Sequence, residues 1–280
     1  MAAYDHQVNQ QYGRHSLSDQ IIAALEAAGK DIDHLTRDDL STFDEFHIGG
    51  LQETRNLAER IPDFRPGMRV LDIGSGLGGP ARTLAAEYGC EVVGLDLTEE
   101  FCEAAARLTD LVGLSDRVTF QHGDALDMPF EDYSFDVVWT QFAGMNIEDK
   151  HGLYAQCRRV LRDGGCFAFH EVLAGNTPDL IYPVFWADTA EINHLRSPDV
   201  MQQTLEAVGF RQVEWVDLTQ YSTDWFEKML AARKNTTEKP PLGFNVFVGE
   251  STPQKAANVI QNLQEGRVRV VQAVYQKEKA

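Results

Sequence analysis

The chain contains, at residues 70–80, the stretch Val70-Leu71-Asp72-Ile73-Gly74-Ser75-Gly76-Leu77-Gly78-Gly79-Pro80. Its apolar beginning is typical of a buried strand, and a proline after the last glycine is typical of the first turn of a helix. Glycines between the two let the backbone approach a ligand closely, and the start of a helix offers unpaired N–H groups to it. The stretch therefore predicts a strand, a glycine turn and a helix, with a nucleotide-like cofactor lying over the turn.

The segments around this turn alternate between short apolar runs and longer helical patterns. The apolar runs lie at residues 69–73, 91–95, 118–122, 135–141 and 166–172, and helical patterns separate them at residues 80–88, 98–112 and 150–161. This alternation is typical of a parallel sheet covered by helices on both faces. Two more strands are expected at residues 211–218 and 267–276, so the prediction is an α/β fold with a seven-stranded, mostly parallel sheet.

The composition disfavours several classes of partner. With 43 Asp and Glu against 25 Lys and Arg, the formal net charge of −18 opposes binding to nucleic acid or to an anionic membrane. No apolar run approaches the roughly 20 residues that cross a bilayer, and the polar N-terminus lacks the apolar core of a signal peptide. The 4 cysteines are far apart, without histidines at metal-ligand spacing. We therefore expect a cytoplasmic protein with reduced, mostly buried thiols and no metal site.

Three acidic side chains at the ends of successive predicted strands narrow the choice of cofactor. Asp96 follows the glycine turn by about 20 residues, where a carboxylate can accept hydrogen bonds from both hydroxyls of a ribose. Asp72 precedes the turn, where it would repel a pyrophosphate but can hold an ammonium group. Asp124 lies where an adenine amino group is expected. An amino acid, a ribose and an adenine together describe S-adenosylmethionine.

A nicotinamide-dependent oxidoreductase is the rival enzyme class, because Gly74, Gly76 and Gly79 also satisfy its GxGxxG pattern. That class has no role for Asp72, and its Tyr-x-x-x-Lys pair does not occur near the fifth predicted strand. These two points favour S-adenosylmethionine over a dinucleotide.

In order and spacing, these motifs resemble those of class I S-adenosylmethionine-dependent methyltransferases over about residues 46–172. The motifs that carry the resemblance are residues 72–79, Asp96, Gly123-Asp124-Ala125, Phe135-Asp136 and Leu161-Arg162-Asp163-Gly164-Gly165. Upstream, residues 46–54 are similar to a segment of phosphoethanolamine and sarcosine/dimethylglycine-type N-methyltransferases. We predict an N-terminal helical lid at residues 1–60, a Rossmann-like cofactor-binding core at 61–175, and the last strands plus a C-terminal cap insertion over the substrate at 176–280. The cap is expected to comprise residues 176–201 and 219–251.

The resemblance also implies where the cofactor is contacted. Carried over by motif, the contacts are His47, Ile48 and Gly49 at the methionine end, Asp72, Gly74 and Gly76 at the amino acid, Asp96 and Leu97 at the ribose, Asp124 and Ala125 at the adenine, and Gln141 near the sulfonium.

Three residues are candidates for the catalytic step. Asn146 stands where the phosphoethanolamine enzymes carry a catalytic histidine, and its neutral amide cannot accept a proton as a base does. His170, beside Glu171 at the end of the fifth predicted strand, is the best remaining acid or base, unless it is a hydrogen-bonded histidine of the core. Tyr12 is expected either to contact the acceptor or to anchor an amphipathic N-terminal helix.

The predicted function is S-adenosylmethionine-dependent methylation of a small molecule, with N-methylation of a small amine as the first expectation. O- or C-methylation of a natural-product-like metabolite is the alternative, since fold does not fix substrate. A cofactor-binding scaffold without catalysis is the alternative from another class. The expected partner is a small-molecule methyl acceptor rather than nucleic acid or a membrane, and a homodimer is left open.

Overall fold

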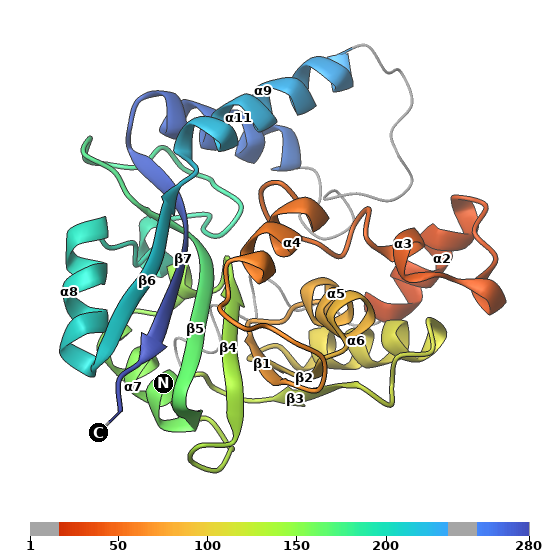
Figure 1. The fold of residues 1–280 in the computed structure, drawn as a ribbon. Helices are drawn as coiled ribbons and strands as arrows, with labels where there is room; N and C mark the ends of the chain where they lie inside the picture. The colour runs from red at the N-terminus through yellow and green to blue at the C-terminus, as the bar shows by residue number, and fades with distance from the viewer. Residues whose placement is uncertain (1–16, 235–250, 280) are drawn as a thin grey trace.

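The computed structural model describes residues 17–234 and 251–279. Figure 1 shows its helices and strands. In chain order they are α2 (Leu17–Ala27), the 3-10 helix η1 (Ile32–His34), α3 (Arg37–Leu40), α4 (Leu51–Glu59), β1 (Arg69–Ile73), α5 (Gly79–Tyr88), β2 (Glu91–Asp96), α6 (Glu99–Leu111), β3 (Val118–His122), β4 (Phe135–Gln141), η2 (Gly144–Asn146), α7 (Lys150–Val160), β5 (Leu161–Ala174), η3 (Ala190–Ile192), α8 (Pro198–Val208), β6 (Phe210–Asp217), α9 (Thr219–Lys234), α11 (Thr252–Gln264) and β7 (Val268–Lys277).

The described strands form a seven-stranded sheet in the order β3-β2-β1-β4-β5-β7-β6 (Figure 1). The first five strands of this order pair in parallel, and β7 runs antiparallel to both β5 and β6. This confirms the predicted α/β fold with a mostly parallel sheet. The chain order of the strands reverses at β1, between β2 and β4, and such a switch point opens a crevice at the carboxyl ends of the strands.

Helices cover both faces of the sheet, because successive side chains of a strand point to opposite sides. Leu71 and Ile73 of β1 share a buried cluster with Tyr154 of α7 and Leu205 of α8. On the opposite face, Val70 of the same strand packs with residues of α4 and α5. The predicted strands and helices of the core agree with the observed ones to within a few residues. The exception is β5, which begins at Leu161, so that Gly164 and Gly165, which separate the predicted helix from the predicted strand, lie within the strand.

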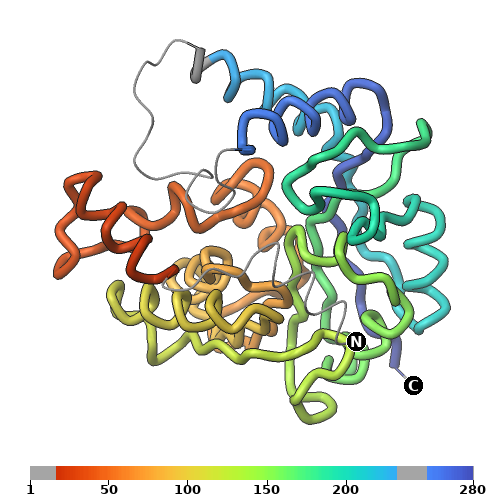
Figure 2. The backbone as a smooth tube through the Cα atoms, turned by 180° about the vertical axis from the view of Figure 1, so that it is seen from behind, coloured from red at the N-terminus to blue at the C-terminus, as the bar shows by residue number. Residues whose placement is uncertain are grey.

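The N-terminal helices lie beside the core. Leu17, Ile21 and Leu25 of α2 form a buried cluster with Ala104 and Leu108 of α6. In Figure 2 the red α2 and α3 lie beside the yellow α6 accordingly. The chain between α3 and α4 then passes over the carboxyl edge of the sheet. The lid at residues 1–60 stays a prediction as a unit.

The C-terminal helices α9 and α11 pack against each other and against β7, near the carboxyl ends of the central strands (Figure 1). Phe226 of α9 and Val259 of α11 share a buried cluster with Trp186 of the irregular segment before η3. The cap was expected to comprise residues 176–201 and 219–251. Residues 198–201 instead begin α8, which packs on α7 and β6 in the core, and residues 235–250 lie outside the described residues. Every helix within the described ranges is too short or too polar to cross a membrane.

Candidate active site

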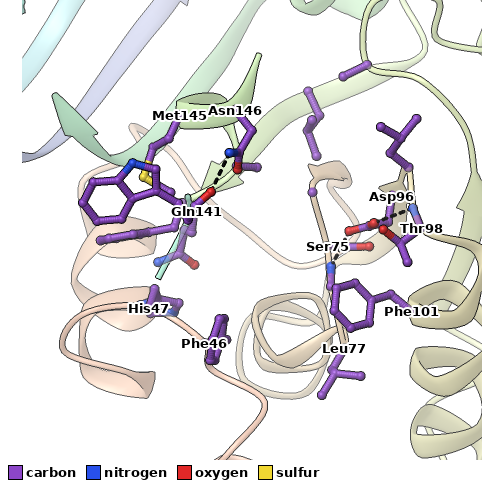
Figure 3. Close-up of a pocket in the computed structure, with 18 of the residues that line it drawn as sticks. Phe46, His47, Ser75, Leu77, Asp96, Thr98, Phe101, Gln141, Met145 and Asn146 are labelled. Atoms are coloured by element: carbon purple, nitrogen blue, oxygen red, sulfur yellow. Dashed lines mark hydrogen bonds between the residues drawn. The ribbon is translucent and has the colours of Figure 1, made fainter. Parts of the chain in front are cut away.

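A cavity of about 370 Å³ lies at the carboxyl ends of β1, β2 and β4, where the strand order reverses (Figure 3). This volume is within the usual range of small-molecule sites. Side chains from separate parts of the chain complete its wall. They are Asp44, Phe46 and His47 before α4, residues 73–77 and Pro80 after β1, residues 95–98 and Phe101 after β2, residues 123–125 after β3, residues 141–143 and 145–147 after β4, and Phe185, Trp186, Asp188, Ser251 and Lys255 from the C-terminal part.

The glycine turn forms the floor of this cavity. Gly74 has a φ of +69°, which disfavours any residue with a side chain. A Cβ built on Gly74 would also lie 2.2 Å from the Cβ of Ala143, which is too close for two carbon atoms. Gly76 has a φ of +51°, and a Cβ there would meet no protein atom within 4 Å. The space over Gly76 is open toward the cavity, as a ligand lying close to the backbone requires.

Asp96 lies at the end of β2, with one carboxylate oxygen directed at the glycine turn and the other at the start of α6 (Figure 3). Oδ2 accepts the N–H of Gly76 at 2.8 Å, and Oδ1 accepts the N–H of Thr98 at 2.9 Å. Burial raises the pKa of Asp96 above its ordinary value, and these two N–H groups oppose that rise. Since each carboxylate oxygen has two lone pairs, one on each oxygen is left for a hydroxyl. The geometry fits the two hydroxyls of a ribose.

Asp72 lies beneath the turn, 2% exposed, and is absent from the cavity wall. Within the described residues its Oδ2 has no hydrogen-bond partner, and the same holds for Ser75 Oγ on the floor of the cavity. Burial and the nearby charges of Glu45 and Asp96 raise the pKa of Asp72 well above its ordinary value. An ammonium group above it would relieve this cost of ionisation, so the unpartnered atoms fit the amino acid end of S-adenosylmethionine, with Asp72 acting from below the wall.

Asp124 and Ala125 line the cavity beyond β3, as the motif implied. The Oδ1 of Asp124 accepts the N–H of Leu126 at 2.8 Å, which fixes the carboxylate at this end of the cavity. Leu97, the residue after Asp96, also lines the wall, as the motif implied.

His47 reaches the opposite end of the cavity and is held by a buried network. Its Nε2 lies 3.0 Å from both Glu45 Oε2 and Thr54 Oγ1, and its Nδ1 lies 3.3 Å from the carbonyl of Ile48. Burial disfavours ionisation of Glu45, but the hydrogen bond and charge of His47 outweigh it, so the pKa of Glu45 lies below its ordinary value. Ile48 and Gly49 do not line the cavity: Ile48 packs in the C-terminal cluster, and Gly49 faces Glu53.

Gln141 ends β4 in the middle of the wall. Its Oε1 accepts hydrogen bonds from Trp139 Nε1 at 3.0 Å and from Thr54 Oγ1 at 3.1 Å. Its amide nitrogen has no partner within the described part of the chain. The side chain therefore has a fixed orientation and an available donor, at the position that the motif assigned to the sulfonium neighbourhood.

Asn146 lines the cavity, but its amide hydrogens are committed elsewhere. Nδ2 donates to the carbonyls of Trp186 at 2.7 Å and Ile192 at 2.9 Å. The side chain therefore fastens the segment before α8 to the cavity wall. This favours a positioning role over proton transfer.

His170 lies behind the wall instead of lining it. The ring is fully buried, and neither nitrogen has a hydrogen-bond partner within the described residues. Its centroid is 4.7 Å from that of Phe142 and 5.7 Å from that of His47. Burial lowers the pKa of His170 well below its ordinary value, so the ring is neutral. Contact with a substrate is blocked by Phe142 and His47, because β5 turns this side chain toward them. Tyr12 lies outside the described residues.

Several residues of the wall were not identified from the sequence. Asp44 and Phe46 belong to an irregular acidic segment without hydrophobic periodicity, so no pattern placed them at the sheet edge. Asp44 is held there by Arg82 of α5, whose Nη2 donates to Asp44 Oδ2 at 2.6 Å while both side chains are buried. Met145 and Lys255 likewise carry no motif, and they meet only in the folded chain.

The four cysteines are free and buried, in agreement with the expected thiols. Among residues 17–234 and 251–279, no cluster of His, Cys, Asp and Glu has the arrangement of a metal site.

Comparison with known proteins identifies the core. Residues 71–169 match the family model described as a methyltransferase domain. The sarcosine/dimethylglycine N-methyltransferase of Halorhodospira halochloris is 33% identical over 172 residues, which cover 59% of this chain and 61% of that protein. The sterol 24-C-methyltransferase of Yarrowia lipolytica is 39% identical over 155 residues, covering 52% of this chain and 40% of that protein. The match thus spans only part of these relatives.

A solved structure with a similar fold is phosphoethanolamine N-methyltransferase 2 of Haemonchus contortus in complex with S-adenosyl-L-methionine. It has a TM-score of 0.70 and 19% identity, and the match covers 95% of this chain and 61% of that chain. The whole described fold, and not only the matched domain, therefore resembles that of a methyltransferase.

Proposed function

We propose that this protein, which carries a class I methyltransferase domain in residues 71–169, uses S-adenosylmethionine to methylate a small molecule. The domain and the cofactor predicted from the sequence are confirmed by the family match and by neighbours solved with that cofactor. The single observation that carries the proposal is the continuous cavity that joins the Asp96 end, fitted to a ribose, to an aromatic end around Phe46 and Trp186.

S-adenosylmethionine supplies a methyl group on a positively charged sulfur, and its transfer to a nucleophile is an in-line displacement. The protein's contribution is then mostly alignment and exclusion of water. Asp96 and the glycine turn hold one end of the site, and Asp124 marks its far limit. His47 and Gln141, both fixed by buried hydrogen bonds, form the wall between the cofactor end and the acceptor end.

N-methylation of a small amine is the form of this activity that we favour. Phe46, Phe142, Phe185 and Trp186 line the acceptor end, and aromatic faces stabilise a cationic ammonium product by about 0.5–2 kcal/mol per contact. A neutral amine needs no base, and Asn146, whose amide hydrogens are bound to two carbonyls, offers none. The similarity to a sarcosine/dimethylglycine N-methyltransferase supports the same choice.

C- or O-methylation of an apolar metabolite is the second candidate, because Met145, Ile147 and the aromatic side chains make the acceptor end largely apolar. An acidic carbon or a phenol must lose a proton before or during transfer, and the buried His47–Glu45 pair, of which His47 lines the cavity, is the acid–base system that we assign to this step. The similarity to a sterol C-methyltransferase supports this candidate.

The test is transfer of a radiolabelled methyl group from S-adenosylmethionine into an extract of small metabolites, followed by identification of the labelled product. A labelled methylamine supports N-methylation, and a labelled apolar product supports the second candidate. An Asp96→Asn variant serves as the cofactor-deficient control. Binding of S-adenosylhomocysteine without any labelled product would refute the enzyme and favour a scaffold.

A further inference from the structure

One wall of the acceptor end is a short loop, residues 142–147, which we call the β4 loop. Phe142, Ala143, Met145 and Asn146 of this loop face the large cavity. Behind the loop lies a second cavity of about 20 Å³, room for roughly one water molecule. The position of the β4 loop therefore decides the shape of the acceptor site, and a group in the second cavity can set that position without touching an acceptor.

Glu171 of β5 lies in this second cavity and binds the backbone of the β4 loop. Its side chain is 3% exposed, and its Oε1 accepts the N–H of Gly144 at 2.8 Å and the N–H of Ala143 at 3.3 Å. A Cβ on Gly144 would lie 3.0 Å from the same oxygen, so the glycine permits this close approach. These hydrogen bonds involve a charged acceptor, and such bonds are stronger than those between neutral groups.

The backbone just before these amides is strained and needs such a restraint. Phe142 has a φ of +56°, in the left-handed region that a bulky residue rarely adopts. Strained residues persist only where their surroundings hold them. The N–H of Phe142 donates to the carbonyl of His170 at 2.9 Å, and its ring packs against the rings of His170 and His47. Together with Glu171, β5 thus fixes three successive residues of the β4 loop.

The charges that face Glu171 come from α7 and from the segment before α8. Lys150 and Tyr154 of α7 line the second cavity, as does Arg196. The Nζ of Lys150 donates to the carbonyls of Gly144, at 2.7 Å, and Ile147, so it binds the other side of the same loop.

Titration of this cluster falls near neutral pH. Burial raises the pKa of Glu171 to about 7, opposed by the loop N–H groups and by Lys150. Burial lowers the pKa of Lys150 to about 8, and the charges of Glu171 and Glu148 oppose this shift. His194 belongs to the same cluster, because it lies near Lys150 and Arg196. Burial lowers the pKa of its ring.

We propose that Glu171 is a positioning residue for methyl transfer: its ionised carboxylate holds the β4 loop through the amides of Ala143 and Gly144 and thereby keeps the acceptor aligned. This inference rests on the proposed function. A protonated carboxyl group is a weaker acceptor for these amides than a carboxylate. The hold is therefore complete at pH values above the pKa of Glu171 and weakens as the pH falls through it, so turnover falls toward acid pH.

The test compares wild-type protein with Glu171→Gln, which keeps the shape of the side chain and removes its charge. Glu103→Gln is the control, because it makes the same chemical change at an exposed position of α6 away from this cluster. The first readout, amide hydrogen exchange at Gly144, needs no turnover. In Glu171→Gln at pH 8 we expect exchange about 10-fold faster than in wild type, because a charge-assisted hydrogen bond is lost.

The second readout is the pH profile of kcat with the acceptor found by radiolabelling. We expect wild-type kcat to fall between pH 8 and pH 6. In Glu171→Gln, kcat at pH 8 should be about 10–100-fold lower, and this acid limb should be absent. The Kd of S-adenosylhomocysteine should stay within about twofold of wild type, because Glu171 lies outside the large cavity. The Glu103→Gln control should match wild type in all three measurements.

The outcomes separate the inference from the proposed function. Unchanged exchange at Gly144 in Glu171→Gln would overturn the anchoring, even in an active enzyme. An acid limb retained in an active Glu171→Gln variant would overturn the positioning role. Absence of methyl transfer by wild-type protein would instead refute the proposed function, whatever the exchange measurement shows.

Discussion

Substitution of Asp96 by asparagine tests the most specific cofactor contact in the site. In the wild type each oxygen of Asp96 accepts one backbone N–H, from Gly76 at 2.8 Å and from Thr98 at 2.9 Å, and has a further lone pair for a ribose hydroxyl. Asparagine replaces one oxygen with an NH₂ group. The NH₂ group is a hydrogen-bond donor, so it faces one backbone N–H, a second donor, without an acceptor between them. It also cannot accept a hydrogen bond from a ribose hydroxyl.

The expected loss of affinity follows from the bonds involved. A hydrogen bond to a charged group contributes about 1.5–3 kcal/mol, and the second hydroxyl now meets a neutral acceptor that is weaker by about 1 kcal/mol. A total of about 2.5–4 kcal/mol corresponds to an increase of about 70- to 1,000-fold in the Kd of S-adenosylhomocysteine.

The assay is isothermal titration calorimetry with S-adenosylhomocysteine on wild type, Asp96→Asn and Asp110→Asn. Asp110 is an exposed residue on α6, so its substitution matches the chemistry without touching the cavity. Circular dichroism establishes that each variant is folded. If folded Asp96→Asn bound S-adenosylhomocysteine as tightly as Asp110→Asn, the assignment of Asp96 to the ribose would be refuted.

Three further predictions concern the walls of the site. Gly74→Ala should lower the free energy of unfolding in urea by more than about 2 kcal/mol, because the φ of residue 74 is +69° and the new Cβ would lie 2.2 Å from that of Ala143. A decrease in the free energy of unfolding below about 0.5 kcal/mol would contradict this close approach. Arg82→Met should destabilise by about 3–5 kcal/mol at neutral pH, since it leaves Asp44 buried without its cation; a melting temperature equal to that of wild type would show that this pair does not hold the segment. Asn146→Ala should lower kcat/KM for the acceptor while the Kd of S-adenosylhomocysteine changes less than about threefold, because it releases two carbonyls of the acceptor wall; equal losses in both would place Asn146 at the cofactor instead.

The core of the fold could be predicted because its signals are local. The bounds predicted for the strands at residues 69–73, 118–122 and 135–141 are those observed, since each is a short apolar run between breakers. The glycine turn and Asp96 were also identified, because their spacing is fixed by the strand–turn–helix unit itself. By contrast β5 was predicted too short, since Arg162 and Asp163 near its start are polar and exposed, and the register between β5 and β4 shifts after the pair Phe135–Leu161.

The acceptor end could not be predicted in the same way. Phe46 and Met145 reach the cavity from segments without periodicity, and only the long-range packing brings them together. The sequence placed His170 at the end of the fifth strand, whereas β5 continues to Ala174. One residue decides which face of the strand a side chain occupies. His170 turns toward the core and Glu171 toward the β4 loop, so Glu171, the second member of that pair, contacts the loop that lines the site.

The central claim is that the cavity at the carboxyl edge binds an adenosyl amino acid rather than a dinucleotide. Calorimetric titration of the wild-type protein with S-adenosylhomocysteine and, separately, with NADH tests this claim most directly. We expect saturable binding of S-adenosylhomocysteine at one site per chain and no binding of NADH at the same concentrations. Saturable binding of NADH, with no heat from S-adenosylhomocysteine, would contradict it.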